Sequence, residues 1–206
     1  QESHGFQYGQ NSPVVKKIFA KQIMERNQHN MEMYYNHPSV IVWSLGNETD
    51  NSQNFVDAYN WIKSQDQSRP VQYERGLWGH GDDSDIYCPM YMSHDKSEKY
   101  AKNDANKRPL IQCEYNHTMG NSSGGFLEYW DLIRKYPKYQ GGYIWDFVDQ
   151  ALHRTPDFKA SRTLADYEAI SAKYESGSGN MSPNYTYGGD YNKKRSEEHT
   201  SELQSL

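Results

Sequence analysis

The sequence predicts an α/β fold: the C-terminal two-thirds of a (β/α)8 TIM barrel, incomplete in this chain. Five strand candidates alternate with helical segments, and no hairpin signal joins one strand to the next. Several of these strands end in polar side chains, and none clearly begins with them. A parallel barrel has the same asymmetry, because its chemistry is confined to the carboxyl ends of the strands. A doubly wound sheet is the alternative, but it would need a nucleotide-type glycine loop, which the sequence lacks.

The composition bounds the class of protein. The 206 residues are enough for one domain with a sizeable core, although 35% hydrophobic residues and a mean hydropathy of -1.07 are low for an α/β domain. The 18 tyrosines and 5 tryptophans offset part of this deficit and suit a site that stacks on sugars. The net charge of -5 argues against a nucleic-acid partner, and no apolar run reaches the length of a membrane span.

The first strand is expected after a helix that a His-Pro step stops. Ser12-Pro13 is typical of a helix start, and His37-Pro38 ends the helix near residue 35. Residues 40–45 are apolar and largely β-branched, which favours a strand buried on both faces. Glu48 follows closely, and a carboxylate there is costly unless water, a partner or a substrate meets it. This segment alone fits a solvated turn residue as well as a catalytic one.

The remaining elements continue the alternation. Further strands are expected at residues 71–74, 85–91, 108–115 and 141–147, and helices around 55–62, within 93–107 and at 125–135. Pro89 predicts that ladder pairing ends within its strand. Cys88 and Cys113 also lie in these strands, where buried free thiols are expected. They do not decide between a cytoplasmic and a periplasmic location.

The chain divides into three parts. Residues 1–191 are expected to form the partial barrel, with residues 153–187, rich in Ser, Asp, Tyr and Gly, as a long surface excursion. Residues 192–206 have no periodic apolar face and look foreign to what precedes them, so they are excluded from the fold prediction. The chain starts at Gln1 rather than Met, and a full barrel needs eight strands, so we expect a fragment.

Glu48 and Glu114 end two different strands of the predicted barrel. Strand ends meet at one face of a barrel, so the two carboxylates could face each other across its mouth. Paired carboxylates around an acetal carbon are the apparatus of glycoside hydrolysis. A separation of about 5–5.5 Å favours retention of configuration, and roughly 6.5–9.5 Å favours inversion. The alternative is that both are ordinary loop carboxylates.

Several motifs resemble glycoside hydrolase family 2. Residues 37–48, His-Pro-Ser-Val-Ile-Val-Trp-Ser-Leu-Gly-Asn-Glu, resemble the acid/base signature of that family. Residues 113–122, followed by Tyr129-Trp130, resemble the nucleophile signature of its β-galactosidase branch. Residues 85–91, 141–150 and 187–190 extend the match, which covers residues 1–191.

The resemblance implies a retaining hydrolase of terminal β-D-galactosides that acts by double displacement, with Glu48 as acid/base and Glu114 as nucleophile. It further implies substrate-binding roles: Asn47 toward the sugar 2-hydroxyl, Tyr91 as donor to the nucleophile, His117 toward sugar hydroxyls, and Trp145 as an apolar floor. His117 could instead cap a loop, and Trp145 could belong to the core. The alternative functions are a β-glucuronidase or other family 2 glycosidase, and a non-catalytic carbohydrate-binding relative.

The resemblance also implies cofactors and partners. Glu2, His4 and Glu48 match the magnesium site of the family, so Mg²⁺ is expected beside the acid/base carboxylate. Na⁺ is implied for the complete enzyme, with ligands outside this chain. The expected partner is a β-galactoside substrate, and the complete enzyme is expected to be a homo-oligomer. This polypeptide alone is expected to be inactive.

Overall fold

The computed structural model describes residues 12–76, 82–118 and 124–147, together with residues 152–153, 163, 165 and 185–186. The chain separates into two compact units, Gln1–Phe147 and Val148–Leu206. In the described part of the second unit, β5 (Leu152–His153) pairs antiparallel with β6 (Tyr185–Thr186). Most of the predicted excursion at 153–187, and the whole tail at 192–206, lie outside the described residues.

The first unit is built on parallel strands. They are β1 (Trp43–Ser44), β2 (Val71–Gln72), β3 (Leu110–Tyr115) and β4 (Tyr139–Ile144). β1 pairs with β2, and β3 pairs with β4. The predicted strand at residues 85–91 runs between the two pairs: the Asp85 amide donates to the Val71 carbonyl at 2.7 Å, and Tyr87 and Met90 form parallel bridges to β3. The five predicted strands therefore follow one another in chain order, as in a parallel barrel.

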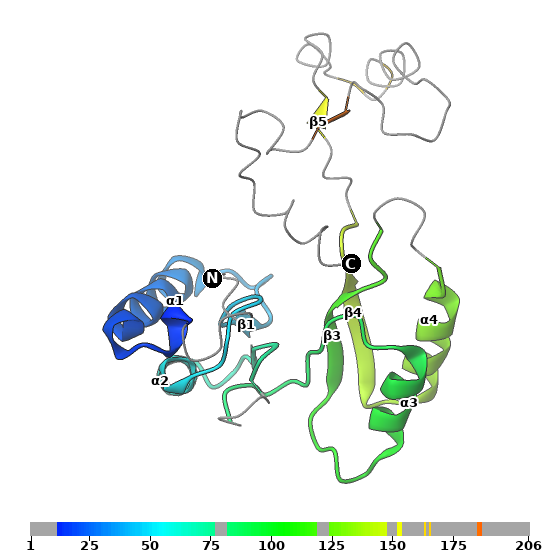
Figure 1. Ribbon diagram of the computed structural model, residues 1–206, viewed down its shortest axis with the longest axis horizontal. Helices are drawn as coiled ribbons and strands as arrows, with labels where there is room; N and C mark the ends of the chain where they lie inside the picture. Colours follow the sequence, from blue (N-terminus) through cyan, green and yellow to red (C-terminus); the bar gives the residue numbers. More distant parts are fainter. Residues whose placement is uncertain are drawn as a thin grey trace. The chain divides into compact units, whose positions relative to one another are not determined.

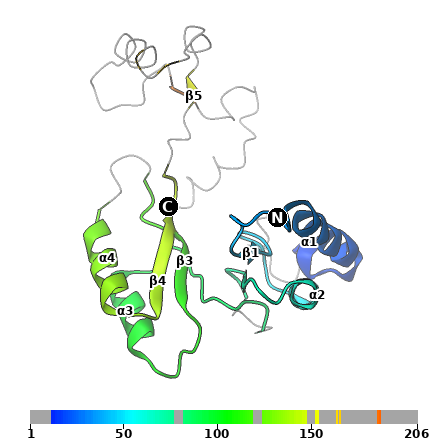
Figure 2. The same ribbon diagram turned by 180° about the vertical axis from the view of Figure 1, so that it is seen from behind.

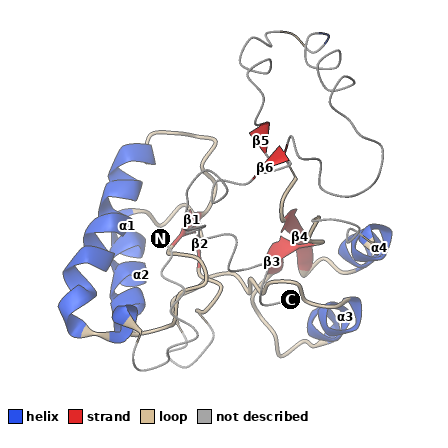
Figure 3. Cartoon of the chain, turned by 45° about the horizontal axis from the view of Figure 1, so that its top comes forward, coloured by secondary structure: helices blue, strands red, loops and turns tan. Residues whose placement is uncertain are grey.

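The helices cover one face of these strands. They are α1 (Ala20–Tyr34), α2 (Gln53–Gln65), α3 (His94–Lys102) and α4 (Phe126–Lys135). Figures 1 and 2 show α1 beside α2 and α3 beside α4. In Figure 3, each helix pair lies on one side of its strands, α1 and α2 by β1 and β2, and α3 and α4 by β3 and β4. No helix in the described ranges combines the length and apolar character that crossing a membrane requires.

Two apolar clusters hold the helices to the strands. Phe55, Ala58 and Ile62 recur at helical spacing along α2 and pack with Trp43 and Val71. The second cluster consists of Ala101, Leu110, Tyr115, Tyr129 and Tyr139. Because side chains alternate along a strand, the residues between these core positions point away from the helices and are available to line a site.

The predicted first helix starts later than the sequence indicates. Ser12-Pro13 leads into two short 3-10 turns, η3 (Pro13–Val15) and η4 (Lys17–Phe19), and α1 begins only at Ala20. Lys16 interrupts the helical backbone with φ -84° and ψ 130°, and the Ser12 side chain makes no capping hydrogen bond. Proline at the first helical position therefore marks a helical turn here, not the continuous helix that was predicted.

The expectation that residues 40–45 are buried on both faces is also wrong. Trp43 and Leu45 are buried, but Ile41 is 67% exposed and Ser44 is exposed. The strand alternates because α1 and α2 cover only one of its faces in the described part of the chain.

Pairing also continues past Pro89, contrary to the sequence prediction. The Pro89 carbonyl accepts from the Cys113 amide at 3.2 Å, and the Tyr91 amide donates to the Glu114 carbonyl at 2.9 Å. Proline lacks only the donor, so its carbonyl still serves the parallel ladder. Cys88 and Cys113 are free thiols, as predicted, but only Cys88 is buried, and Cys113 is half-buried.

Candidate active site

A pocket of about 420 Å³ lies at the carboxyl ends of the parallel strands. It is lined by Ser44, Gly46, Asn47, Gln72, Glu74, Cys113, Glu114, Tyr143, Ile144, Trp145 and Asp146. Three of the predicted site residues, Asn47, Glu114 and Trp145, are among them. The volume is in the range of small-molecule sites, and the lining combines aromatic surface with several polar groups.

An irregularity in β3 turns Glu114 toward this pocket. Leu110 and Gln112 are fully buried on the helix side, and strict alternation would send Glu114 to that side as well. The pairing with β4 shifts register between Gln112 and Tyr115, so Cys113 and Glu114 both line the pocket. Glu114 remains only 8% exposed there.

Tyr91 is joined to Glu114 by its side chain and its backbone. The Tyr91 hydroxyl donates to Oε2 of Glu114 at 2.5 Å, and the Tyr91 amide donates to the Glu114 carbonyl at 2.9 Å. The ring of His117 lies 5.7 Å from that of Tyr91, centroid to centroid. The structure therefore places Tyr91 on the buried Glu114 carboxylate and His117 beside Tyr91.

Trp145 is tied to the same strand end. Its amide donates to the Tyr115 carbonyl at 3.1 Å, and its carbonyl accepts from the Thr118 amide at 2.8 Å. The peptide bond between Trp145 and Asp146 is cis. These contacts fix the backbone of Trp145 beside the loop that follows Glu114.

Backbone strain collects at the ends of three strands. Glu48, Tyr91 and Asn116 have φ values of 41°, 48° and 52°, and they are the non-glycine residues with positive φ in the described ranges. Each such residue costs on the order of 1–3 kcal/mol and persists only where its surroundings over-determine it. Two of the three, Glu48 and Tyr91, were predicted site residues, and Asn116 lies between Glu114 and His117.

Glu74 is a pocket carboxylate that the sequence analysis did not select. It follows β2, accepts a hydrogen bond from the Glu48 backbone amide, and pairs with the Arg75 guanidinium at 3.0 Å. The pKa of Glu74 is raised to about 7, mainly because the carboxyl is buried; the Arg75 charge opposes this shift, and the nearby Glu48 charge adds to it. Its signal in the sequence was the one that marks Glu48 and Glu114: a carboxylate at the end of a predicted strand.

Comparison with known proteins identifies the family. Residues 2–201 match the glycosyl hydrolases family 2, TIM barrel domain. This chain belongs to glycosyl hydrolase family 2. The β-galactosidase of Leuconostoc mesenteroides is 44% identical over 168 residues, which cover 73% of this chain and 15% of that protein. The chain thus spans only a small part of the length of this curated relative.

Solved structures of two β-glucuronidases are similar to this chain. The β-glucuronidase of Bacteroides uniformis matches with a TM-score of 0.50 and 17% identity, over 65% of this chain and 22% of that one. The β-glucuronidase of Faecalibacterium prausnitzii matches with a TM-score of 0.45 and 19% identity, over 66% of this chain and 30% of that one. The family match and the B. uniformis structure together show a TIM-barrel fold for this chain.

Of the three predicted magnesium ligands in this family 2 chain, only Glu48 lies among the residues that the structure describes. Glu2 and His4 lie outside the described residues, and the described residues hold no cluster of three His, Cys, Asp or Glu side chains suited to a metal. Two carboxylates are donors that Mg²⁺ prefers, and the histidine is a softer addition, so the donor set is compatible with the ion. Magnesium stays a prediction.

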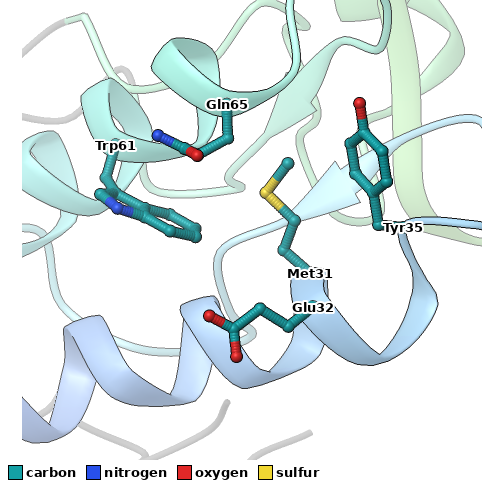
Figure 4. Close-up of a pocket in the computed structure, with 5 residues that line it drawn as sticks. All are labelled: Met31, Glu32, Tyr35, Trp61 and Gln65. Carbon is teal, nitrogen blue, oxygen red and sulfur yellow. The ribbon is translucent and has the colours of Figure 1, made fainter.

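A second pocket, of about 400 Å³, lies between α1 and α2, on the helix layer of the domain (Figure 4). Its lining residues are Met31, Glu32, Tyr35, Trp61 and Gln65. In Figure 4, Trp61 and Gln65 extend from α2, and Met31 and Glu32 from α1. None of the predicted site residues lines this pocket, so the strand-end pocket is the candidate active site.

Proposed function

We propose that this chain supplies the catalytic carboxylates of a retaining glycosidase that cleaves terminal β-D-galactosides. The observation that carries the proposal is Glu114, a buried carboxylate in a strand-end pocket that accepts the Tyr91 hydroxyl. The 44% identity to a β-galactosidase favours galactosides over the glucuronides named for the structural neighbours. We also propose that the five strands belong to the C-terminal two-thirds of the barrel.

The proposed reaction has two displacements. In the first, a Glu114 oxygen attacks the anomeric carbon while Glu48 gives its proton to the departing glycosidic oxygen, which forms a glycosyl-enzyme ester. In the second, Glu48 takes a proton from water, the water oxygen attacks the anomeric carbon, and the ester bond to Glu114 breaks. Two inversions restore the original configuration of the sugar.

The other residues bind and orient the sugar in this scheme. The Tyr91 hydroxyl stabilises the Glu114 carboxylate as it leaves in the second displacement. Asn47 binds the 2-hydroxyl, and Trp145 offers an apolar face to the sugar ring. His117, whose ring approaches Tyr91, binds other hydroxyls.

Mg²⁺ is proposed as the cofactor, held by Glu2, His4 and Glu48. The ion would supply positive charge beside the acid/base carboxylate. Glu48 holds and releases the proton, and the backbone contact with Glu74 orients its peptide. Removal of the ion with a chelator is expected to lower turnover, and restoring Mg²⁺ should recover it.

The test uses the full-length protein that contains this chain. Turnover of nitrophenyl β-galactoside is compared with that of the β-glucuronide and the β-mannoside, and preference for the galactoside is expected. Glu114→Gln should abolish turnover, while Glu128→Gln, an exposed change on α4, should leave it intact. Unchanged turnover in Glu114→Gln would remove Glu114 from the role of nucleophile, and preference for another sugar would overturn the substrate assignment.

A further inference from the structure

A buried amide connects Tyr139, the first residue of β4, to the strained backbone next to Tyr91. Gln112 lies on β3 and is 0% exposed. Its Nε2 donates to the Tyr139 hydroxyl at 2.7 Å, and its Oε1 accepts from the Met92 backbone amide at 2.6 Å. Both ends of the side chain are therefore occupied by specific partners.

The carbonyl of the same residue, Met92, is held by α4. The Tyr129 hydroxyl donates to the Met92 carbonyl at 2.9 Å. Gln112 and Tyr129 thus hold the donor and the acceptor of Met92, the residue that directly follows Tyr91. Tyr91 itself has a φ of 48°, a conformation that a bulky residue adopts only when its neighbours impose it.

Packing alone does not explain a glutamine at this position. Leu110, two residues earlier on the same face of β3, meets the helix layer with an apolar side chain and is equally buried. A buried amide is tolerated only where its hydrogen bonds are made, and here one of them ends on the backbone next to Tyr91. The distance between the Tyr91 hydroxyl and Glu114 depends on where that backbone lies.

We propose that Gln112, together with Tyr129, is a positioning residue that holds Tyr91 where its hydroxyl reaches Glu114. This inference rests on the proposed function, in which Tyr91 assists the departure of Glu114 from the glycosyl-enzyme. If Tyr91 is displaced, the second displacement slows and the intermediate accumulates. The kinetic signature is a fall of kcat and KM together on a substrate whose leaving group makes the first step fast.

The experiment compares four variants of the full-length enzyme on dinitrophenyl β-galactoside, with active sites counted by titration. Tyr91→Phe sets the reference. Gln112→Met keeps the volume of the side chain but removes the acceptor of the Met92 amide. This variant and Tyr129→Phe should each lower kcat and KM together. The expected fall for Gln112→Met is about tenfold or more, since a misplacement of ~1 Å can cost about a hundredfold in rate. Tyr139→Phe removes the other partner of Gln112 and should keep wild-type kcat and KM per active site.

Each outcome supports or overturns the proposed positioning role of Gln112. A lower kcat at unchanged KM in Gln112→Met, or an equal effect in Tyr139→Phe, means a structural role and overturns the proposal. If Gln112→Met does not fold, the test rests on Tyr129→Phe alone. Wild-type kcat and KM in Tyr129→Phe would then overturn the proposal. Failure of the wild type on galactosides, or wild-type constants in Tyr91→Phe, would instead overturn the proposed function, and the inference would fall with it.

Discussion

The Tyr91 hydroxyl donates to Oε2 of Glu114 at 2.5 Å, and the Tyr91 amide donates to the carbonyl of the same residue at 2.9 Å. Two contacts to one residue fix both the position and the direction of the phenol. A neutral donor directed at one carboxylate oxygen stabilises the ionised form, which in a retaining glycosidase is both the attacking and the leaving group.

Tyr91→Phe should therefore slow turnover without unfolding the protein. A hydrogen bond to a charged group contributes about 1.5–3 kcal/mol, which corresponds to a loss of roughly 10–100-fold in kcat. Tyr91 is 41% exposed and the change removes a single oxygen, so its contribution to packing is kept. Steady-state kinetics and thermal unfolding measure the two effects. Tyr34→Phe, an equally exposed change on α1, is the control, and a matching loss in it would contradict the assignment.

Glu48→Gln tests the acid/base role through the leaving group. Loss of a general acid costs typically about 10²–10⁴-fold, but little when the leaving group needs no proton. We expect a large fall in kcat/KM on lactose-type substrates and a much smaller fall on dinitrophenyl β-galactoside. Equal losses on both substrates would show that Glu48 affects folding or binding, because neither depends on the basicity of the leaving group.

Glu74 should make stability depend on pH. Burial raises its pKa from 4.5 to about 7, so the folded state binds more protons than the unfolded state between these values, and this residue lowers the unfolding free energy as pH rises through that window. Glu74→Gln cannot ionise and keeps an oxygen for the Glu48 amide. The unfolding free energy of the variant should equal that of the wild type near pH 4.5. Above pH 7 it should be higher than that of the wild type by on the order of 3 kcal/mol.

Unfolding is measured across this pH range with a chelator present, so that metal binding does not enter. Glu128→Gln, an exposed change on α4, is the matched control for loss of one carboxylate and should not reproduce the gain in unfolding free energy expected of Glu74→Gln. A difference for Glu74→Gln that shrinks as pH rises would have the wrong sign and would contradict the raised pKa.

The strands and the carboxylates that follow them were predictable because both signals are local. A short predicted strand that is followed by a carboxylate is visible within ten residues, as at Glu48 and Glu114. The alternation of strands and helices, together with the spacing of Phe55, Ala58 and Ile62, predicted the order of elements that the structure shows.

The orientation of the site residues was not predictable in the same way. Glu114 lines the pocket because the β3 register shifts next to it, and that shift depends on the pairing with β4. Tyr91 has a strained φ and is followed by Met92, whose backbone is held by Gln112 and Tyr129; these two residues are 21 and 38 positions from Tyr91. Such conditions arise only once distant segments pack, so a single sequence does not display them.

Gly142 illustrates such a condition and leads to a last prediction. A Cβ on Gly142 would lie 2.8 Å from Cδ1 of Tyr115, whose ring is 1% exposed and meets the Tyr129 ring edge-on at 5.3 Å. The ring has no room to retreat, so Gly142→Ala should cost about 1–3 kcal/mol of stability. Tyr115 directly follows Glu114, so a shift of Tyr115 should also displace Glu114. We therefore expect both the turnover and the midpoint temperature of unfolding to fall.

Gly124→Ala is the control for this change. Among the described residues, no atom lies within 4 Å of a Cβ at Gly124, which is exposed ahead of α4, so its effect should stay within about 0.5 kcal/mol. Thermal unfolding and kcat on a nitrophenyl β-galactoside are measured for both variants. Wild-type stability in Gly142→Ala would mean that β3 and β4 can separate at Tyr115, and the close packing that holds Glu114 at the pocket would then be ruled out.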